Sequence, residues 1–409
     1  MKNTGIFPAE ILIPENTDMT KWSCVACDQF TSEKGYWDAL SAFVGAEKST
    51  LKLTLPEIYL NDGADGRIRA INEEIKKYIK GGVFRKLPKG YVLTVRSTPF
   101  VKRRIGLVAA ADLDSYDYKK GVKNLIRATE GTIEERIPPR LKIRENAEIE
   151  LPHIIILFDD EKREITEKLY ERKAEFIKLY DFELNMGGGH IEGYFIPASE
   201  NLAEKFSALL DEERLMNKYG KKDEFAFAVG DGNHSLATAK AHWEKIKAGL
   251  NVEERKTHPA RYALAEFVNI YDEGIYFEPI YRFVTGVNPD KFVDGLKQNV
   301  KGRYRAVYGG EIAEIKGDNP LPSVLTETDG YISRYLAENG GAVDYVHGEE
   351  NLYGLVKADK TAVGVMTDAL DKSDLFRFVS QNGALPRKTF SMGEGVEKRY
   401  YLEAKYIRK

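Results

Sequence analysis

The segment Gly230 to Ser235 (GDGNHS) joins two stretches of different character. The apolar run Phe225 to Val229 precedes it, and the alanine- and lysine-rich stretch Leu236 to Lys247 follows it. This pattern predicts a strand, a tight turn and a helix. The free N–H groups at the start of a helix carry partial positive charge and suit an anion, especially a phosphate. The glycines of the turn would let such a ligand approach the main chain closely.

The side chains of this turn could do several kinds of chemistry. Asp231 could bind a metal ion or act as a base, and His234 could act as an acid, a base or a phosphate contact. The alternative is an ordinary turn in which Asn233 or Ser235 caps the helix. The segment matches neither the G-x-x-x-x-G-K-[ST] phosphate loop nor the G-x-G-x-x-G fingerprint. The pattern by itself therefore indicates no more than an anion site at a helix N-terminus.

Charged residues between 127 and 144 form a second group of candidates. Glu130 could take a proton from a hydroxyl group, although the nearby Arg127 would weaken it as a base unless the carboxylate were partly desolvated. Arg136, Arg140 and Arg144 could each bind two phosphate oxygens through the guanidinium group. The alternatives are a surface glutamate and exposed arginines that pair with neighbouring glutamates.

Several ordered segments together resemble the domain-of-unknown-function 1015 family. The turn resembles its D-G-H-H-R-like motif, and four further segments are similar to segments of the family in the same order. These are Leu51 to Leu60 (LKLTLPEIYL), Leu125 to Leu141 (LIRATEGTIEERIPPRL), Ile280 to Val284 (IYRFV) and Ala384 to Phe390 (ALPRKTF).

The resemblance implies a fold and an activity. The expected fold is a ParB/sulfiredoxin-like mixed sheet flanked by helices and extended by a second lobe. The implied activity is that of the free-serine kinases, a nucleotide-dependent transfer of phosphate to a small hydroxylated metabolite. Mg²⁺ and a nucleotide, ATP or ADP, are the implied cofactors. Two alternatives stay open: a nucleotide-binding switch or scaffold without rapid turnover, and a hydrolase of a phosphorylated metabolite.

The resemblance also implies roles for individual residues. Glu130, Asp231 and His234 would be catalytic, with Asp231 holding the metal. Asn233 and Ser235 stand where the family motif has a histidine and an arginine, so nucleotide binding carries over only if Arg104, Arg136 or Arg140 supplies the missing charge. The implied phosphate and nucleotide contacts are Gly230, Gly232, Asn233, Ser235, Thr132, Arg104, Arg136, Arg140, Arg282 and Lys388.

Composition and charge exclude several classes of partner. The formal net charge of the 409 residues is −3, so the chain has no overall basic field for duplex DNA or anionic lipid. Apolar stretches such as Ile154 to Phe158 are far shorter than the ~20 residues of a membrane span. No secretory signal is visible, and Cys24 and Cys27 are interpreted as reduced thiols rather than as a redox or metal pair. We therefore expect a cytoplasmic protein whose partners are a small-molecule substrate and a nucleotide, with a homodimer left open.

The elements that must position these residues intermix along the chain. Strands are predicted at Tyr91 to Arg96, Ile105 to Leu113 and His153 to Phe158, and helices at Ile71 to Ile79 and Lys162 to Tyr180. The fold class is therefore α/β, with mixed α+β character. Shifts in composition suggest an N-terminal lobe, 1–215, and a C-terminal lobe, 216–409, that carries the turn, unless the chain forms one integrated unit.

Overall fold

The computed structural model describes residues 3–60, 62–119, 121–222 and 224–409. The chain forms two compact units, the first made of Met1–Ile275 and Glu394–Lys409 and the second of Tyr276–Gly393. The expected division at 215/216 falls instead inside helix α7 (Glu212–Tyr219) of the first unit. The shift in composition at that point therefore coincides with a charged, largely exposed helix.

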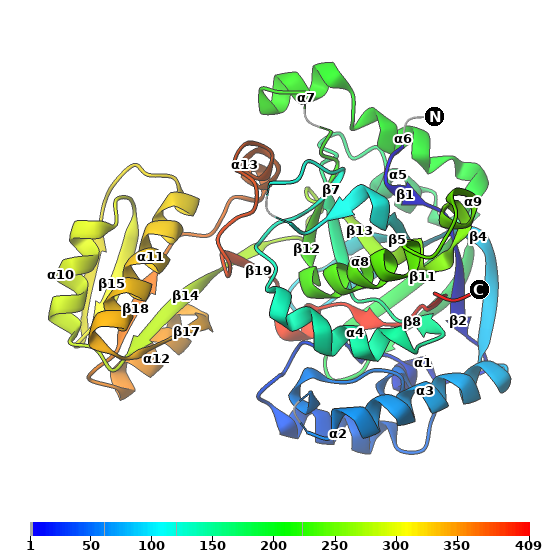
Figure 1. Ribbon diagram of the computed structural model, residues 1–409, viewed down its shortest axis with the longest axis horizontal. Coiled ribbons are helices and arrows are strands. Elements are labelled where there is room, and N and C mark those ends of the chain that lie inside the picture. Colours follow the sequence, from blue (N-terminus) through cyan, green and yellow to red (C-terminus); the bar gives the residue numbers. More distant parts are fainter. Residues whose placement is uncertain (1–2, 61, 120, 223) are drawn as a thin grey trace. The chain divides into compact units, whose positions relative to one another are not determined.

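The first unit is built on a large mixed sheet (Figure 1). Its strands follow the order β10-β11-β4-β5-β13-β9-β12-β7-β6, with β1 paired to β5 and β2 to β4. The strand bounds are β1 Ile6–Phe7, β2 Ala9–Pro14, β4 Phe84–Ser97, β5 Arg104–Asp112, β6 Tyr116–Asp117, β7 Ile126–Ala128, β9 Ile155–Phe158, β10 Ile177–Leu184, β11 Gly189–Pro197, β12 Phe227–Asp231 and β13 Tyr262–Asn269.

The central strands are apolar because both faces of the sheet are covered. Every residue of β5 is buried, and neighbouring side chains of that strand enter different cores. Val108 packs in the core that includes α3, whereas Leu107 and Ala109 pack in the core that includes α8. A strand buried on both faces appears in the sequence as a continuous apolar run, and Ile105 to Leu113 has that pattern.

Helices cover the two faces of this sheet (Figure 1). Residues of α2 and α3 contribute to one core, and residues of α5, α6 and α8 contribute to the other. The helix bounds in this unit are α1 Met19–Trp22, α2 Lys34–Val44, α3 Ala64–Lys80, α4 Ile137–Glu145, α5 Thr166–Glu171, α6 Leu202–Ala208, α7 Glu212–Tyr219, α8 Asn233–Lys247 and α9 Val252–Thr257.

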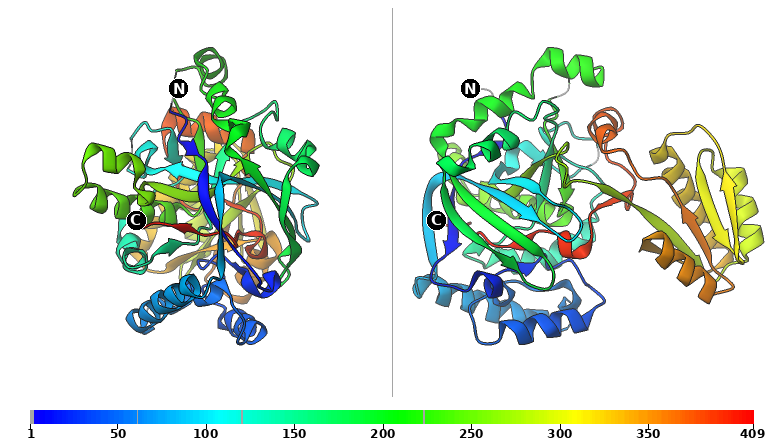
Figure 2. Two further views of the ribbon diagram at one scale, coloured as in Figure 1. Left: turned by 90° about the vertical axis from the view of Figure 1, so that its right-hand side faces the viewer. Right: turned by 180° about the vertical axis from the view of Figure 1, so that it is seen from behind.

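The chain returns to the first unit after Gly393 and runs through its interior (Figure 2). In this segment β20 (Tyr400–Tyr401) pairs with β3 (Cys24–Val25), and β21 (Lys405–Tyr406) pairs with β8 (Ile149–Glu150). Arg399 is buried against the sheet, where its Nε lies 2.8 Å from Glu266 Oε2 on β13. Residues late in the sequence thus become part of the core of the first unit.

The second unit is a smaller sheet with helices on both faces. Its main strand order is β16-β15-β18-β14-β17, and β19 pairs with β14. Helices α10 and α11 pack in one core and α12 packs in the other. The bounds are β14 Phe277–Thr285, β15 Tyr304–Tyr308, β16 Glu311–Ile315, β17 Ala342–His347, β18 Val363–Met366, β19 Phe390–Met392, α10 Pro289–Asn299, α11 Leu321–Asn339, α12 Glu349–Ala358 and α13 Leu375–Asn382.

The predicted fold class, a mixed α/β protein with a second lobe, is confirmed. The long helix predicted over Lys162 to Tyr180 is wrong, because α5 ends at Glu171 and Ile177–Leu184 forms strand β10. Pairing with β11 in a hairpin overrides the helical pattern of that stretch. Over the residues that the structure describes, no helix combines the length and apolar character needed to cross a bilayer.

Candidate functional site

The turn at the end of β12 has a backbone that requires glycine at one position. The ladder between β12 and β9 is irregular between Val229 and Asp231, so a bulge falls at Gly230. Gly232 then adopts φ +78°. A Cβ atom at this position would lie 3.1 Å from the Cα of Ile154, at the entry to β9. Left-handed backbone and close packing together favour glycine here.

Helix α8 begins directly after Gly232 without a side-chain cap. Its N-cap residue is Gly232, and within the described chain no side chain accepts a cap hydrogen bond there. The alternative in which Asn233 or Ser235 caps the helix is therefore wrong. Asn233 is only 7% exposed, and its Oδ1 has no hydrogen-bond partner among the described residues. Because the first N–H groups of a helix lack acceptors within the helix, this end can bind an added polar group.

The loop that carries Glu130 is tied to the turn at both ends. Strands β7 and β12 are parallel, so their carboxyl ends meet at one edge of the sheet. Thr129 Oγ1 donates to the Val229 carbonyl at 2.6 Å, and the Ile133 N–H donates to His234 Nε2 at 3.3 Å. The structure thus brings the half-buried Glu130 to the same edge as the predicted turn.

Two further predicted site residues, Thr132 and His234, lie on opposite sides of the contact between the Glu130 loop and helix α8. Thr132 lies in the tethered loop, and its buried Oγ1 has no partner in the part of the chain described. His234 accepts the Ile133 hydrogen bond through Nε2, so this side chain connects the loop to the first turn of α8.

The carboxylate of Asp231 pairs with Lys398, which was not among the predicted site residues. Its Oδ1 accepts from the Gly232 N–H at 3.0 Å, and its Oδ2 lies 3.4 Å from Lys398 Nζ. The side chains of Asp231 and Lys398 are 20% and 9% exposed. A carboxylate and an ammonium group therefore stand together beside the start of α8.

A buried histidine cluster adjoins the first turn of α8. Ser235 Oγ lies 3.1 Å from His153 Nε2, and Asp28 Oδ2 lies 3.4 Å from the same nitrogen. The Tyr401 hydroxyl is 2.8 Å from His153 Nδ1. Burial works to lower the pKa of His153, but the charge and hydrogen bond of Asp28, together with the charges of Asp231 and Glu57, outweigh burial and raise that pKa above its ordinary value. His153, which was not among the predicted site residues, thus lies against Ser235, which was.

The predicted arginines of the first unit differ in their contacts and in their relation to the turn. Arg104 is buried and donates through Nη1 to the Glu397 carbonyl at 3.1 Å, next to Lys398. Its Nε has no hydrogen-bond partner among the residues described. Arg140 forms an ion pair with Glu57, and Arg136 is exposed, with its carbonyl accepting from Arg140. Arg104 is thus linked to the turn through the C-terminal segment, whereas Arg140 is occupied by a structural pair.

Arg282 and Lys388 belong to the second unit. Arg282 is fully buried there and donates through Nε and Nη2 to the two carboxylate oxygens of Asp329. Its Nη1 donates to the carbonyls of Ile280 and Lys388. The Lys388 side chain is exposed. These contacts make Arg282 a structural link between β14, α11 and the segment before β19.

Cys24 lies in strand β3, and Cys27 follows that strand. Both are free thiols in the structure. Burial raises the pKa of Cys24 to about 11, which disfavours the thiolate that redox or metal chemistry needs.

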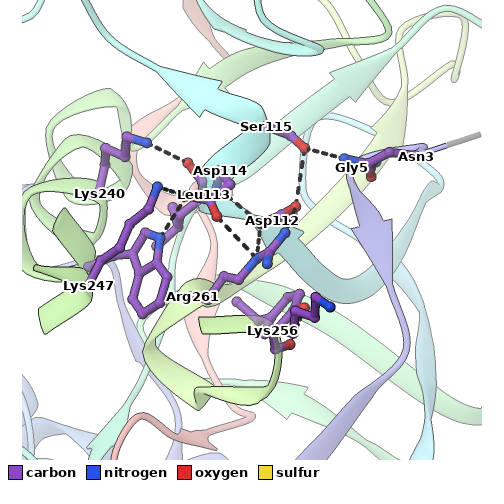
Figure 3. A network of polar contacts seen from close by, with 12 residues as sticks. Asn3, Gly5, Asp112, Leu113, Asp114, Ser115, Lys240, Lys247, Lys256 and Arg261 are labelled. Carbon is purple, nitrogen blue, oxygen red and sulfur yellow. Dashed lines mark hydrogen bonds and ion pairs between the residues drawn. The ribbon is translucent and has the colours of Figure 1, made fainter. Parts of the chain in front are cut away.

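A polar network connects the rest of α8 to the 3₁₀ turn, Leu113–Ser115, that follows β5 (Figure 3). Lys240 Nζ donates to the Leu113 carbonyl at 2.8 Å, and Lys247 Nζ donates to Asp114 Oδ1 at 2.6 Å. Arg261 binds both oxygens of the neighbouring Asp112, each at 2.8 Å. The helix whose first turn forms the candidate site is therefore anchored along its length.

Comparison with known proteins gives one family and several similar solved structures. A family model described as protein of unknown function (DUF1015) matches residues 6–375. No curated protein matches the chain. Similar solved structures are a conserved hypothetical protein from Pyrococcus furiosus, at 10% identity and TM-score 0.35, over 74% of this chain and 95% of that one. A free serine kinase in complex with AMP gives 10% identity and TM-score 0.38, over 74% and 91%. SbnI with a C-terminal truncation, from Staphylococcus aureus, gives 9% and 0.37, over 70% and 82%. At these TM-scores the likenesses carry no argument about this chain.

Proposed function

The chain belongs to the DUF1015 family, whose function is unknown, and we propose that it is a nucleotide-dependent phosphotransferase acting on a small hydroxylated metabolite. The observation that carries this proposal is the uncapped start of α8. Its N–H groups stand beside the buried Oδ1 of Asn233, which has no partner among the described residues, and beside the carboxylate of Asp231. Such an end binds a phosphate group of the nucleotide.

Cations of the first unit offset the charge that develops during transfer. Lys398 lies against Asp231, and Arg104 binds the Glu397 carbonyl one residue earlier. Buried positive groups at the place where negative charge develops stabilise a transition state more strongly than they would in water. Together they take the place of the motif arginine, for which this chain has Ser235.

Glu130 receives the proton of the acceptor hydroxyl. The hydroxyl oxygen forms a bond to phosphorus while the bond between phosphorus and the nucleotide oxygen breaks, and the shortened nucleotide leaves with that electron pair. Contacts from Thr129 and His234 hold the Glu130 loop at the edge where phosphate binds. A general base must lie within reach of the proton it removes, and this tether supports that geometry.

The residues of the turn also fit a magnesium ion. Asp231 supplies a carboxylate, and Asn233 Oδ1 is a buried acceptor without a partner among the residues described, both of the oxygen type that Mg²⁺ prefers. When bound, the ion would neutralise charge on the phosphate oxygens.

The proposal is tested by binding and transfer measured on the full chain. ATP and ADP are titrated with and without Mg²⁺ by calorimetry, and phosphate transfer to hydroxylated amino acids, sugars and uncharged aromatic or branched alcohols is followed by ³¹P NMR. Asp231→Ala should reduce transfer by about a hundredfold or more while the melting temperature stays within a few degrees. Asp38→Ala, on an exposed residue of α2 that pairs with Lys34, is the matched control and should transfer normally.

Other outcomes would overturn the phosphotransferase. Nucleotide binding without transfer would favour a switch or scaffold, and release of phosphate from a phosphorylated metabolite would favour a hydrolase. Wild-type transfer by the Asp231→Ala protein would remove this carboxylate from the reaction.

A further inference from the structure

A cavity of about 160 Å³ lies within the first unit beside the start of α8. Residues of α3, α4 and α8 and of the segment before β9 line it. Nine of the lining side chains are leucine or isoleucine, among them Ile71 and Ile75 of α3 and Ile143 of α4. The body of the cavity is therefore apolar.

One part of the cavity lining is polar and belongs to the candidate site. Ser235 and His153, which lie 3.1 Å apart, both line it, and so does Tyr401. A serine hydroxyl offers one donor and two acceptor positions, so Ser235 can bind His153 and still contact a ligand oxygen. Because Ser235 is the third residue of α8, this polar part adjoins the proposed phosphate-binding turn.

The charged groups of the lining are paired with one another. Arg140 forms an ion pair with Glu57, and Arg144 forms one with Glu150. Both pairs are largely buried, with side-chain exposures between 5% and 18%. These two pairs, together with His153 beside Asp28, leave no uncompensated charge in the lining, so the part of a ligand that enters the cavity body is uncharged.

The volume limits the size of this ligand. An apolar protein cavity of about 150 Å³ holds one benzene molecule. The present cavity therefore takes about six to eight non-hydrogen atoms, the size of one aromatic ring or a branched alkyl group.

We propose that this cavity binds the apolar part of a small neutral alcohol whose oxygen contacts Ser235. This inference rests on the proposed function, in which the alcohol is the acceptor of the phosphate. It assigns the acceptor to amphipathic alcohols with an aromatic or branched aliphatic group, rather than to compact polar alcohols.

Benzyl alcohol and toluene are suitable probes, because they differ by one hydroxyl group. Each is titrated into the full chain without nucleotide, and the isoleucine methyl groups are observed by NMR. The methyl signals of Ile71, Ile75 and Ile143 should shift with saturation, while that of Ile332 in the second unit should not. Benzyl alcohol should bind about fivefold more tightly than toluene, since one neutral hydrogen bond favours it.

Matched variants separate the cavity from its surroundings. Ile75→Phe fills the cavity and should weaken both probes at least about tenfold, because bulk placed in a packed cavity excludes a ligand of that size. Ile79→Phe changes the same helix one turn further on, outside the lining, and should bind as the wild type does. Ser235→Ala should remove the preference for benzyl alcohol and leave toluene binding unchanged. The wild-type methyl shifts and the Ser235→Ala comparison test the proposal even if Ile75→Phe fails to fold.

The outcomes distinguish this inference from the proposed function. Absence of saturable shifts at the lining methyls, equal shifts at Ile332, or an alcohol preference that survives Ser235→Ala would overturn the cavity proposal, whatever the nucleotide does. Shifts confined to the lining in a protein that binds no nucleotide would support the cavity as an alcohol site and overturn the phosphotransferase.

Discussion

Lys398 Nζ lies 3.4 Å from Asp231 Oδ2, although 166 residues separate the two in the sequence. Asp231 ends a central strand, and Lys398 arrives with the segment that re-enters the first unit after Gly393. Without that segment the carboxylate of Asp231 would lose its ion pair with Lys398 at the proposed phosphate-binding turn. The contact therefore connects the C-terminal segment to the electrostatics of the site.

Removing this ammonium group should weaken nucleotide binding. In Lys398→Met the carboxylate of Asp231 repels the phosphate without compensation, so affinity for ATP should fall about tenfold or more, the size of a charge-assisted contact. Lys398→Arg keeps the positive charge and should retain most of the affinity. Calorimetry on the two variants checks this, and equal affinities for Met and Arg would show that the charge at 398 is irrelevant.

Gly232 should be far less tolerant than another glycine of similar backbone. Gly220, at the end of α7, has φ +75° and open space within 4 Å of where an alanine Cβ would lie, so Gly220→Ala should cost about 1–2 kcal/mol. Gly232→Ala adds a contact at 3.1 Å to Ile154 and should cost about 1–3 kcal/mol more. Urea unfolding of both variants measures the difference, and identical losses would mean that the contact with Ile154 is relieved without cost.

Glu130→Gln should slow phosphate transfer without changing nucleotide affinity. Loss of a general base typically lowers kcat by about 10²–10⁴-fold, whereas a residue that only binds would change KM or Kd. Glu135→Gln alters an exposed glutamate of the neighbouring 3₁₀ turn and serves as the control. Steady-state kinetics with calorimetry separate the two effects. Parallel losses of rate and affinity in Glu130→Gln would argue against a base at this position.

Asp28→Asn should lower the pKa of His153. Burial alone would lower that pKa, and the negative charge of Asp28 is the main cause that raises it above 6.5. Because the pKa is raised in the folded state, its contribution to stability is fully present below about pH 6.5 and is lost as the pH rises through the folded value. An imidazole ¹⁵N NMR titration of wild type and variant measures the change. A His153 pKa that does not move would mean that another group sets it.

His242 should produce the opposite dependence on pH. Burial first, and then the charge of Arg144, lower the pKa of His242 from 6.5 to about 4. As the pH falls from 6.5 towards 4, His242 becomes protonated in the unfolded chain but stays neutral in the folded protein. The free energy of unfolding therefore decreases by at most about 1.4 kcal/mol per pH unit. His242→Phe should lose this component of the pH dependence. Urea unfolding at several pH values compares the slopes, which would coincide if His242 titrated normally.

The central site elements could be predicted because their signals are local. An apolar run, glycines at 230 and 232 and a helical pattern were sufficient to place the turn between β12 and α8. The proximity of Glu130 followed from family likeness, and the physical reason is the parallel pairing of β7 with β12. The fold class also followed from the intermixed strand and helix patterns.

The remaining site residues depend on pairings that span the whole chain. His153 reaches Ser235 because β9 runs antiparallel to β12, and no local pattern specifies that neighbour. Asp28 and Tyr401 join it from segments more than 370 residues apart, connected by β3 and β20. A histidine at the start of an apolar strand was the available signal, and that signal favours a structural residue. The same lack of local signal explains why the unit boundaries at Ile275 and Glu394 were missed.

The discontinuity of the first unit determines when this site can exist during synthesis. A ribosome must translate all of Tyr276–Gly393 before the codons for Lys398 and Tyr401 are reached. A nascent chain that has emerged only as far as α8 carries Asp231, Asn233 and Ser235. It lacks Lys398, which pairs with the Asp231 carboxylate, and Tyr401, whose hydroxyl contacts His153 Nδ1. The candidate site is therefore complete only after the second unit has been translated. Translation products that end before Lys398 contain an incomplete site.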